Sequence, residues 1–261
     1  IYDPAGIEMS VGEKEINSRT YYARLTKSMV AAISAPMTEM SLFQVDMRLR
    51  PSGNQGPVAT SWESFKHYQT SEAWVWEHLA LVNATIITGP EGLKADISEF
   101  CNSLKTLRPD EKVMSGLSIM RKRLLASRSM DEKWSLKLGQ GKLQDIELVS
   151  QMGILLSNED ISGVHSGLMN LNKLKKICAE DLNYLINTYE LLLSVQILSK
   201  LLLKEDIKDR ELGANGKDLL FKHTDTSSIP SLIEKIAEMT AKSATIISNI
   251  LPNPKEVYDE R

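Results

Sequence analysis

The sequence predicts a mainly α-helical protein of the α+β class, in which a small α/β domain is followed by a helical bundle. Six or more segments repeat apolar residues at helical spacing, whereas a single segment alternates apolar and polar residues as a strand does. The run TGPEG at residues 88–92 combines residue types that interrupt regular structure. We therefore expect two domains, residues 1–92 and residues 93–261.

Composition limits the classes of function. The chain has 261 residues, of which 42% are hydrophobic and 25% charged, so it can bury a sizeable core. Its net charge of -3 argues against a general binder of nucleic acid or anionic membranes. The two cysteines show neither metal-ligand spacing nor a disulfide pattern, which suits a reducing cytoplasm. No apolar run reaches the roughly 18 residues of a spanning helix. We expect a cytoplasmic protein that binds no nucleic acid and no membrane.

The first predicted element is a helix from about Thr20 to Ser34. Asn17 or Ser18 can cap its start, and Pro36 lies just beyond its end. Its apolar face repeats at helical spacing through Tyr22, Leu25, Met29, Ala32 and Ile33.

The central segment of the chain, residues 42–56, reads LFQVDMRLRPSGNQG. Its first half alternates, so a strand would place four hydrophobic side chains on one face and Asp46, Arg48 and Arg50 on the other. Such a polar face is a plausible platform for metal and phosphate, although a solvated sheet face has the same pattern. Pro51 ends the strand. The turn PSGNQG follows, and its glycines, Gly53 among them, could let backbone amides approach an anion.

A second helix is predicted to start at Ser61 or Ser64 and to run through Phe65 and Tyr68. The segment EAWVWEH at residues 72–78 follows, and a helical pattern continues from Glu77 to Ile87. A lone histidine beside an acid is more often a surface or satisfied residue than a catalytic one.

Beyond residue 92 every segment is helical in character. Helices are expected over residues 94–107, 111–125, 181–203 and from Ser228 or Ser231 to Leu251. The segment 181–203 is rich in leucine but interrupted by polar residues, which indicates a central bundle helix rather than a membrane span.

The segment KLGQGKLQDIEL, residues 137–148, is a turn that leads into a helix. Asp145 in the first helical turn suits the positive end of the helix dipole, so capping is an adequate structural explanation for it. Asp145 and Glu147 lie two positions apart and do not converge on a helix, which argues against a joint metal site.

Two of these segments, FQVDMRLRPSG and EAWVWEH, resemble the second nucleotidyltransferase domain of the bifunctional glutamine synthetase adenylyltransferases. In that family the first half of the protein removes AMP from a tyrosine of glutamine synthetase, and the second half adds it. The resemblance extends from Ile1 to about Leu203, and the DIE of residues 145–147 matches a further family motif. It implies a remnant of a nucleotidyltransferase α/β domain followed by helices.

The resemblance also implies site residues. Asp46 would be a catalytic carboxylate and Mg²⁺ ligand, with ATP as substrate. Residues expected to contact the nucleotide or the protein substrate are Arg48, Arg50, Ser52, Gly53, Glu77, Lys137, Asp145 and Glu147. The family's other two metal aspartates would precede Ile1, so we expect a fragment that is inactive alone.

The sequence departs from the family at several positions, of which four suggest an alternative function. Leu79, Asn83 and Thr85 replace a glutamine and two arginines, and Lys142 replaces a glycine. These departures motivate an alternative, a non-catalytic helical module that binds glutamine synthetase or a PII-type signalling protein.

Overall fold

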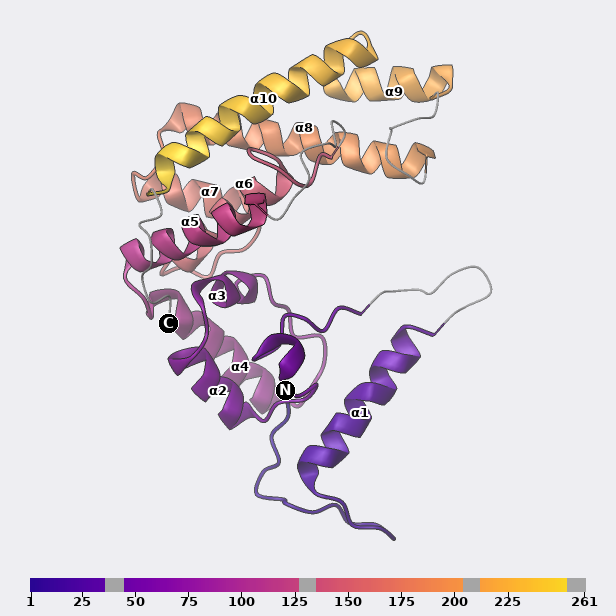
Figure 1. Cartoon of the computed structure of the whole chain (residues 1–261), viewed down its shortest axis with the longest axis vertical. Helices are drawn as coiled ribbons and strands as arrows, with labels where there is room; N and C mark the ends of the chain where they lie inside the picture. Colours follow the sequence, from indigo (N-terminus) through magenta and orange to yellow (C-terminus); the bar gives the residue numbers. More distant parts are fainter. Residues whose placement is uncertain (36–44, 127–134, 204–211, 253–261) are drawn as a thin grey trace. The chain divides into compact units, whose positions relative to one another are not determined.

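The structure, a computed structural model, describes residues 1–35, 45–126, 135–203 and 212–252 (Figure 1). Within these ranges the chain is mainly α-helical and contains no β-strand, which confirms the predicted fold class.

It forms two compact units, Ile1–Leu107 and Arg108–Glu260. The helices of the first unit are α1 (Ser18–Ile33), α2 (Trp62–Ser71), α3 (Val75–Leu81) and α4 (Glu91–Ser103), with short 3-10 turns at Gly53–Gln55 and Leu104–Thr106. Those of the second are α5 (Asp110–Ala126), α6 (Leu143–Leu155), α7 (Val164–Lys173), α8 (Ala179–Leu203), α9 (Ala214–Thr224) and α10 (Ile229–Ile250).

Helices α1 and α2 begin where their capping residues predict. The Asn17 side chain accepts a hydrogen bond from the Thr20 N–H at 2.8 Å, and Ser61 Oγ accepts from the Ser64 N–H at 3.3 Å. Each cap satisfies an amide that the first helical turn leaves without an intrahelical partner. Both predicted helices are therefore confirmed.

An aromatic cluster forms the core of the first unit. Trp62 and Phe65 on α2 lie with their ring centroids 5.4 and 6.2 Å from that of Phe100 on α4. Because this packing holds α4 against α2, the first unit continues through α4 to Leu107. The glycine-proline run at residues 88–92, expected to divide the domains, instead leads from α3 into α4 within one unit.

The strand expected at residues 42–50 is not found in the part of it that the structure describes, since 42–44 lie outside the described residues. Val45–Met47 have no regular structure, and the chain turns from Arg48 onward. A strand needs a neighbour to accept its backbone hydrogen bonds. Here the Asp46 carboxylate accepts the Arg48 N–H at 2.9 Å, a local bond that favours a turn.

Helix α3 ends earlier than its periodicity predicts, at Leu81 rather than near Ile87. The segment that follows contains Asn83 and several β-branched residues, all of which are weak helix formers. Leu79 is buried within α3, whereas Asn83 and Thr85 lie beyond the helix and are exposed. The three departures from the family therefore do not share one helical face.

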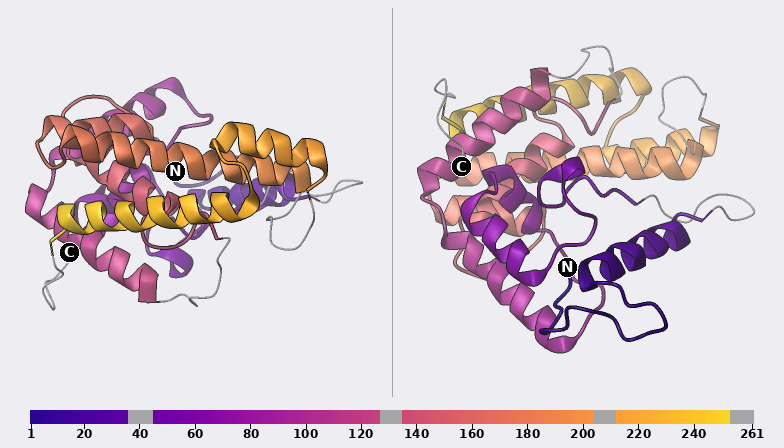
Figure 2. Two further views of the ribbon diagram at one scale, coloured as in Figure 1. Left: turned by 90° about the horizontal axis from the view of Figure 1, so that it is seen from above. Right: turned by 60° about the horizontal axis from the view of Figure 1, so that its bottom comes forward.

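The second unit is a helical bundle around α8, which contacts α6, α7, α9 and α10 (Figures 1 and 2). Helix α10 begins at the cap formed by Ser228, as predicted. The buried side chains of one hydrophobic core cluster are Leu136, Leu143, Leu191, Leu192, Val195, Leu212, Leu220, Leu232 and Ile236. By length and composition α8 is the one described helix apolar enough to cross a membrane, and in the structure it lies within this bundle.

Candidate functional site

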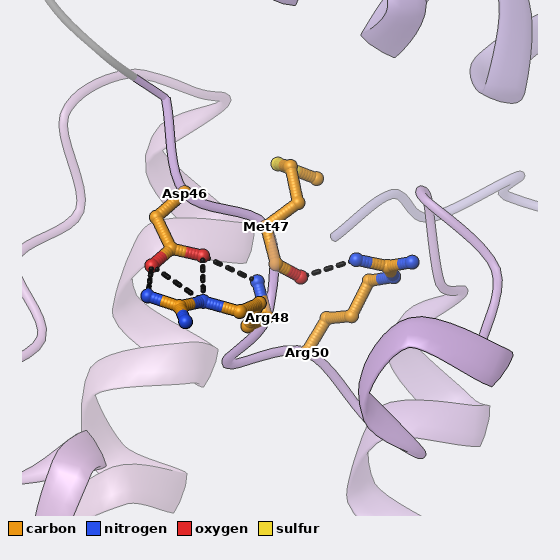
Figure 3. A network of polar contacts seen from close by, with 4 residues as sticks. All are labelled: Asp46, Met47, Arg48 and Arg50. Atoms are coloured by element: carbon orange, nitrogen blue, oxygen red, sulfur yellow. Dashed lines mark hydrogen bonds and ion pairs between the residues drawn. The ribbon is translucent and has the colours of Figure 1, made fainter.

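The loop from Val45 to Gly56 carries most of the site residues that the sequence predicts. Its outer edge is an ion pair between Asp46 and Arg48 (Figure 3). Arg48 Nη2 lies 2.6 Å from Asp46 Oδ2, and Arg48 Nε lies 3.0 and 2.9 Å from the two carboxylate oxygens. The side chains are 75% and 54% exposed for Arg48 and Asp46, so a ligand in solvent can reach both.

Arg48 strongly favours the ionised form of Asp46. Its side-chain hydrogen bonds, followed by its backbone N–H, lower the pKa of the Asp46 carboxyl from 3.8 to about 2. The pair is formally neutral. A phosphate that approached Arg48 would therefore compete with Asp46 for the same guanidinium.

Arg50 organises the loop from within. Its guanidinium donates to the carbonyl of Gly56 at 3.1 Å and to that of Asn54 at 3.2 Å. It also donates to the carbonyl of Met47, as Figure 3 shows. Gly56 closes the loop tightly, since a Cβ atom there would lie 1.9 Å from the Pro51 carbonyl oxygen. Arg50 is thus a positioning residue for the loop.

Ser52 and Gly53 lie at the turn of the loop, both with left-handed backbone, at φ 60° and 53°. Sequence reasoning suggested that the glycine amides could meet an anion. In the structure the Gly53 N–H donates to the Arg50 carbonyl at 2.8 Å and the Gly56 N–H to the Gly53 carbonyl at 3.1 Å. These amides therefore close the loop on itself.

Glu77 is buried at the start of α3. It accepts the Trp74 N–H at 2.9 Å and the Tyr68 hydroxyl at 2.9 and 3.1 Å. The neighbouring His78 is 1% exposed, and its Nε2 lies 2.9 Å from the Gln69 carbonyl oxygen. Glu77 thus ties α3 to α2, a partnership that the sequence does not signal because Tyr68 lies nine positions earlier.

Asp145 lies in the second unit, in the first turn of α6, and is 4% exposed. It accepts hydrogen bonds from Arg121 Nε at 2.7 Å, Arg121 Nη2 at 2.9 Å and the Gly141 N–H at 2.7 Å. Arg121 belongs to α5. Both carboxylate oxygens are therefore engaged within the protein, which supports the structural explanation of Asp145.

Lys137 and Glu147 both lie in the second unit, and their charges interact. Partial burial raises the pKa of the Glu147 carboxyl above 4.5, and the charge of Lys137 opposes that shift. Lys142, which replaces a family glycine, adopts the extended backbone of the residue that precedes α6. The structure thus gathers Asp46, Arg48, Arg50, Ser52 and Gly53 in one loop and Lys137, Asp145 and Glu147 in the other unit.

We expect Glu147→Gln to stabilise the chain increasingly as the pH rises. A carboxyl whose folded pKa is raised contributes fully to stability below its ordinary pKa of 4.5 and loses that contribution as the pH rises through the folded value. Glutamine does not titrate. The melting temperatures of the two proteins should therefore diverge from about pH 4.5 upward in favour of the variant, and a constant difference from pH 4 to pH 8 would refute the prediction.

The described residues do not form a magnesium site. They contain no group of three His, Cys, Asp or Glu side chains close enough to hold a metal ion. Asp46 stands alone with its two oxygens bonded to Arg48. Since Mg²⁺ is normally bound by carboxylates together with substrate phosphates, this donor set does not fit the ion by itself.

Comparison with protein families matches residues 1–100 to the glutamate-ammonia ligase adenylyltransferase family. The matched residues include the loop with Asp46 and Arg48, as well as Glu77.

Several relatives are named bifunctional glutamine synthetase adenylyltransferase/adenylyl-removing enzyme. The protein from Rhizobium meliloti is 32% identical over 96% of this chain and 26% of its own length. That from Bartonella quintana is 30% identical over 92% of this chain and 25% of its own. That from Mesorhizobium japonicum is 40% identical over 59% of this chain and 16% of its own. The chain thus spans about a quarter or less of the length of these relatives.

Proposed function

Because the chain belongs to the glutamate-ammonia ligase adenylyltransferase family, we propose that it is part of an enzyme that transfers AMP from ATP to a tyrosine of glutamine synthetase. In this reaction the tyrosine oxygen forms a bond to the α-phosphorus of ATP, and the bond from that phosphorus to the departing pyrophosphate breaks. The complete activity is proposed for a protein as long as the relatives.

The observation that carries the proposal is the family match over residues 1–100, which contains the Val45–Gly56 loop. The loop presents an exposed guanidinium, Arg48, on a turn that Arg50 fixes through three carbonyl groups. A guanidinium can form two parallel hydrogen bonds to a phosphate, and a fixed loop loses little entropy on binding. We assign Asp46, Arg48 and Ser52 to contact with the nucleotide or with the protein substrate, and Arg50 to positioning.

The family's Mg²⁺ is proposed to depend on residues beyond those that the structure describes, because the donor set around Asp46 does not fit the ion alone. We further propose that the 261-residue chain does not transfer AMP by itself.

The experiment mixes glutamine synthetase, magnesium and ATP labelled in its α-phosphate with either this chain or a protein of the relatives' length that contains it. We expect label on glutamine synthetase only with the longer protein. No label with the longer protein would overturn the proposed function. Sustained, Asp46-dependent labelling by the 261-residue chain would show instead that its own residues suffice.

A second candidate is a non-catalytic module that binds glutamine synthetase or a PII-type signalling protein. It is favoured by the end of α3 at Leu81, because Asn83 and Thr85, which replace residues of the family, lie outside the helix. Under this alternative, the longer protein would bind glutamine synthetase in a pull-down but would leave it unlabelled.

A further inference from the structure

We propose that Tyr68 is a positioning residue for the Val45–Gly56 loop, which it holds against α2 and α3 in the geometry that AMP transfer requires. The Tyr68 side chain lies where α2 meets the loop, since it lines one pocket together with Ser52. The loop and both helices belong to the first unit. The inference deepens the proposed function and rests on it, because the same loop carries Asp46 and Arg48.

The turn that Tyr68 meets has an unfavourable backbone conformation. Ser52 is left-handed, at φ 60° and ψ 17°, which disfavours any residue with a Cβ atom. Such a conformation persists only where surrounding contacts hold it. The hydrogen bonds that Arg50, Gly53 and Gly56 donate all end on carbonyl groups of the loop itself. These bonds shape the loop but do not fix it to the helices.

The Tyr68 hydroxyl joins the turn to both helices. Burial raises the pKa of this hydroxyl most, and the hydrogen bond that its oxygen accepts from the Ser52 N–H opposes the shift. The hydroxyl donates to Glu77, whose two carboxylate oxygens lie 2.9 and 3.1 Å away. Glu77 is buried and also accepts the Trp74 N–H at 2.9 Å, at the start of α3. One hydroxyl thus accepts from the loop and donates to α3, a double role that phenylalanine cannot fill.

This link decides where the exposed side chains of the loop lie. Asp46 and Arg48 precede Ser52 by six and four positions, so a turn released from Tyr68 would carry both of them with it. Arg50 fixes them only relative to the rest of the loop. A displacement of about 1 Å can cost on the order of a hundredfold in rate when a reaction depends on orientation.

The link itself is tested by amide hydrogen exchange at Ser52 in the 261-residue chain, followed by NMR. Tyr68→Phe keeps the ring and removes the hydroxyl, so the Ser52 amide should exchange about three- to tenfold faster, as expected for one lost hydrogen bond. The control is Phe100→Leu, which weakens the aromatic packing of α4 against α2 and leaves the hydroxyl in place. It should not change the exchange of this amide. Unchanged exchange in Tyr68→Phe, or equal acceleration in the control, would overturn the proposal.

The consequence for the reaction is tested in a protein of the relatives' length that contains this chain. Per folded molecule, Tyr68→Phe should lower kcat for labelling glutamine synthetase about tenfold or more, and should change the KM for ATP less, because orientation matters most in the transition state. Phe100→Leu should lower the unfolding midpoint yet keep kcat. Wild-type kcat in Tyr68→Phe, or an equal loss of kcat in both variants, would overturn the positioning role.

The two measurements separate this inference from the proposed function. If the unsubstituted longer protein failed to label glutamine synthetase, the proposed function would be overturned, and with it the role of Tyr68 in the reaction. The exchange measurement uses no AMP transfer and judges the link between Tyr68 and Ser52 by itself.

Discussion

Replacing Gly141 by alanine should destabilise the helical unit by about 2–5 kcal/mol. Gly141 has φ +68°, and a Cβ atom there would lie 2.0 Å from the Thr240 carbonyl oxygen and 2.6 Å from the Ala244 amide nitrogen, both on α10. The variant must therefore bear the cost of a left-handed alanine and also push the loop away from α10. Urea unfolding followed by far-ultraviolet dichroism measures the loss.

Gly163 provides the matched control. It has φ +81°, but no atom lies within 4 Å of the position that its Cβ would occupy. Its ψ of 161° places the backbone in a region that is nearly exclusive to glycine. Gly163→Ala should therefore cost only this backbone strain, about 1–3 kcal/mol. Equal losses in the two variants would show that the close approach to α10 contributes nothing.

Replacing Asp145 by asparagine should cost about 3–5 kcal/mol, the usual consequence of removing one partner from a buried ion pair. Asparagine keeps the shape but leaves the Arg121 guanidinium, whose side chain is only 13% exposed, without its carboxylate. The bond from the Gly141 N–H to Asp145 is weakened as well. The loss should appear as a lower urea midpoint at neutral pH.

The exposed pair of Glu159 and Lys173 is the control for this prediction. Their side chains are 61% and 58% exposed, and their charged atoms lie 3.1 Å apart. Glu159→Gln should change stability by no more than about 1 kcal/mol. If Asp145→Asn behaved in the same way, the ion pair with Arg121 would not be a structural anchor.

Elements governed by local chemistry could be predicted from the sequence. Helices α1, α2 and α10 begin at capping residues that lie beside the first turn, and α8 follows from its composition. The boundary between the two units could not be predicted from the sequence, because Phe100 packs against α2 and keeps α4 in the first unit. A loop signal marks where a helix starts and does not show which neighbour that helix will contact.

The predicted strand failed for the same reason, since alternation shows that a segment suits a sheet but supplies no neighbouring strand. Within the described residues, Asp46 and Arg50 instead close the segment into a loop. The site residues of this loop are adjacent in sequence, so their grouping was predictable. The partner of Asp145 was not, because Arg121 lies 24 positions away with no shared motif.

The role of the Val45–Gly56 loop is tested most directly by measuring AMP transfer to glutamine synthetase, per folded molecule, by a protein of the relatives' length that contains this chain. Asp46→Asn should abolish transfer while leaving the unfolding midpoint unchanged, because Asp46 is exposed and the substitution preserves its shape. Asp145→Asn should lower the midpoint yet keep most of the transfer of the molecules that remain folded. Wild-type transfer by the Asp46 variant, or loss of transfer without loss of stability in the Asp145 variant, would contradict the assignment of the reaction to the Val45–Gly56 loop.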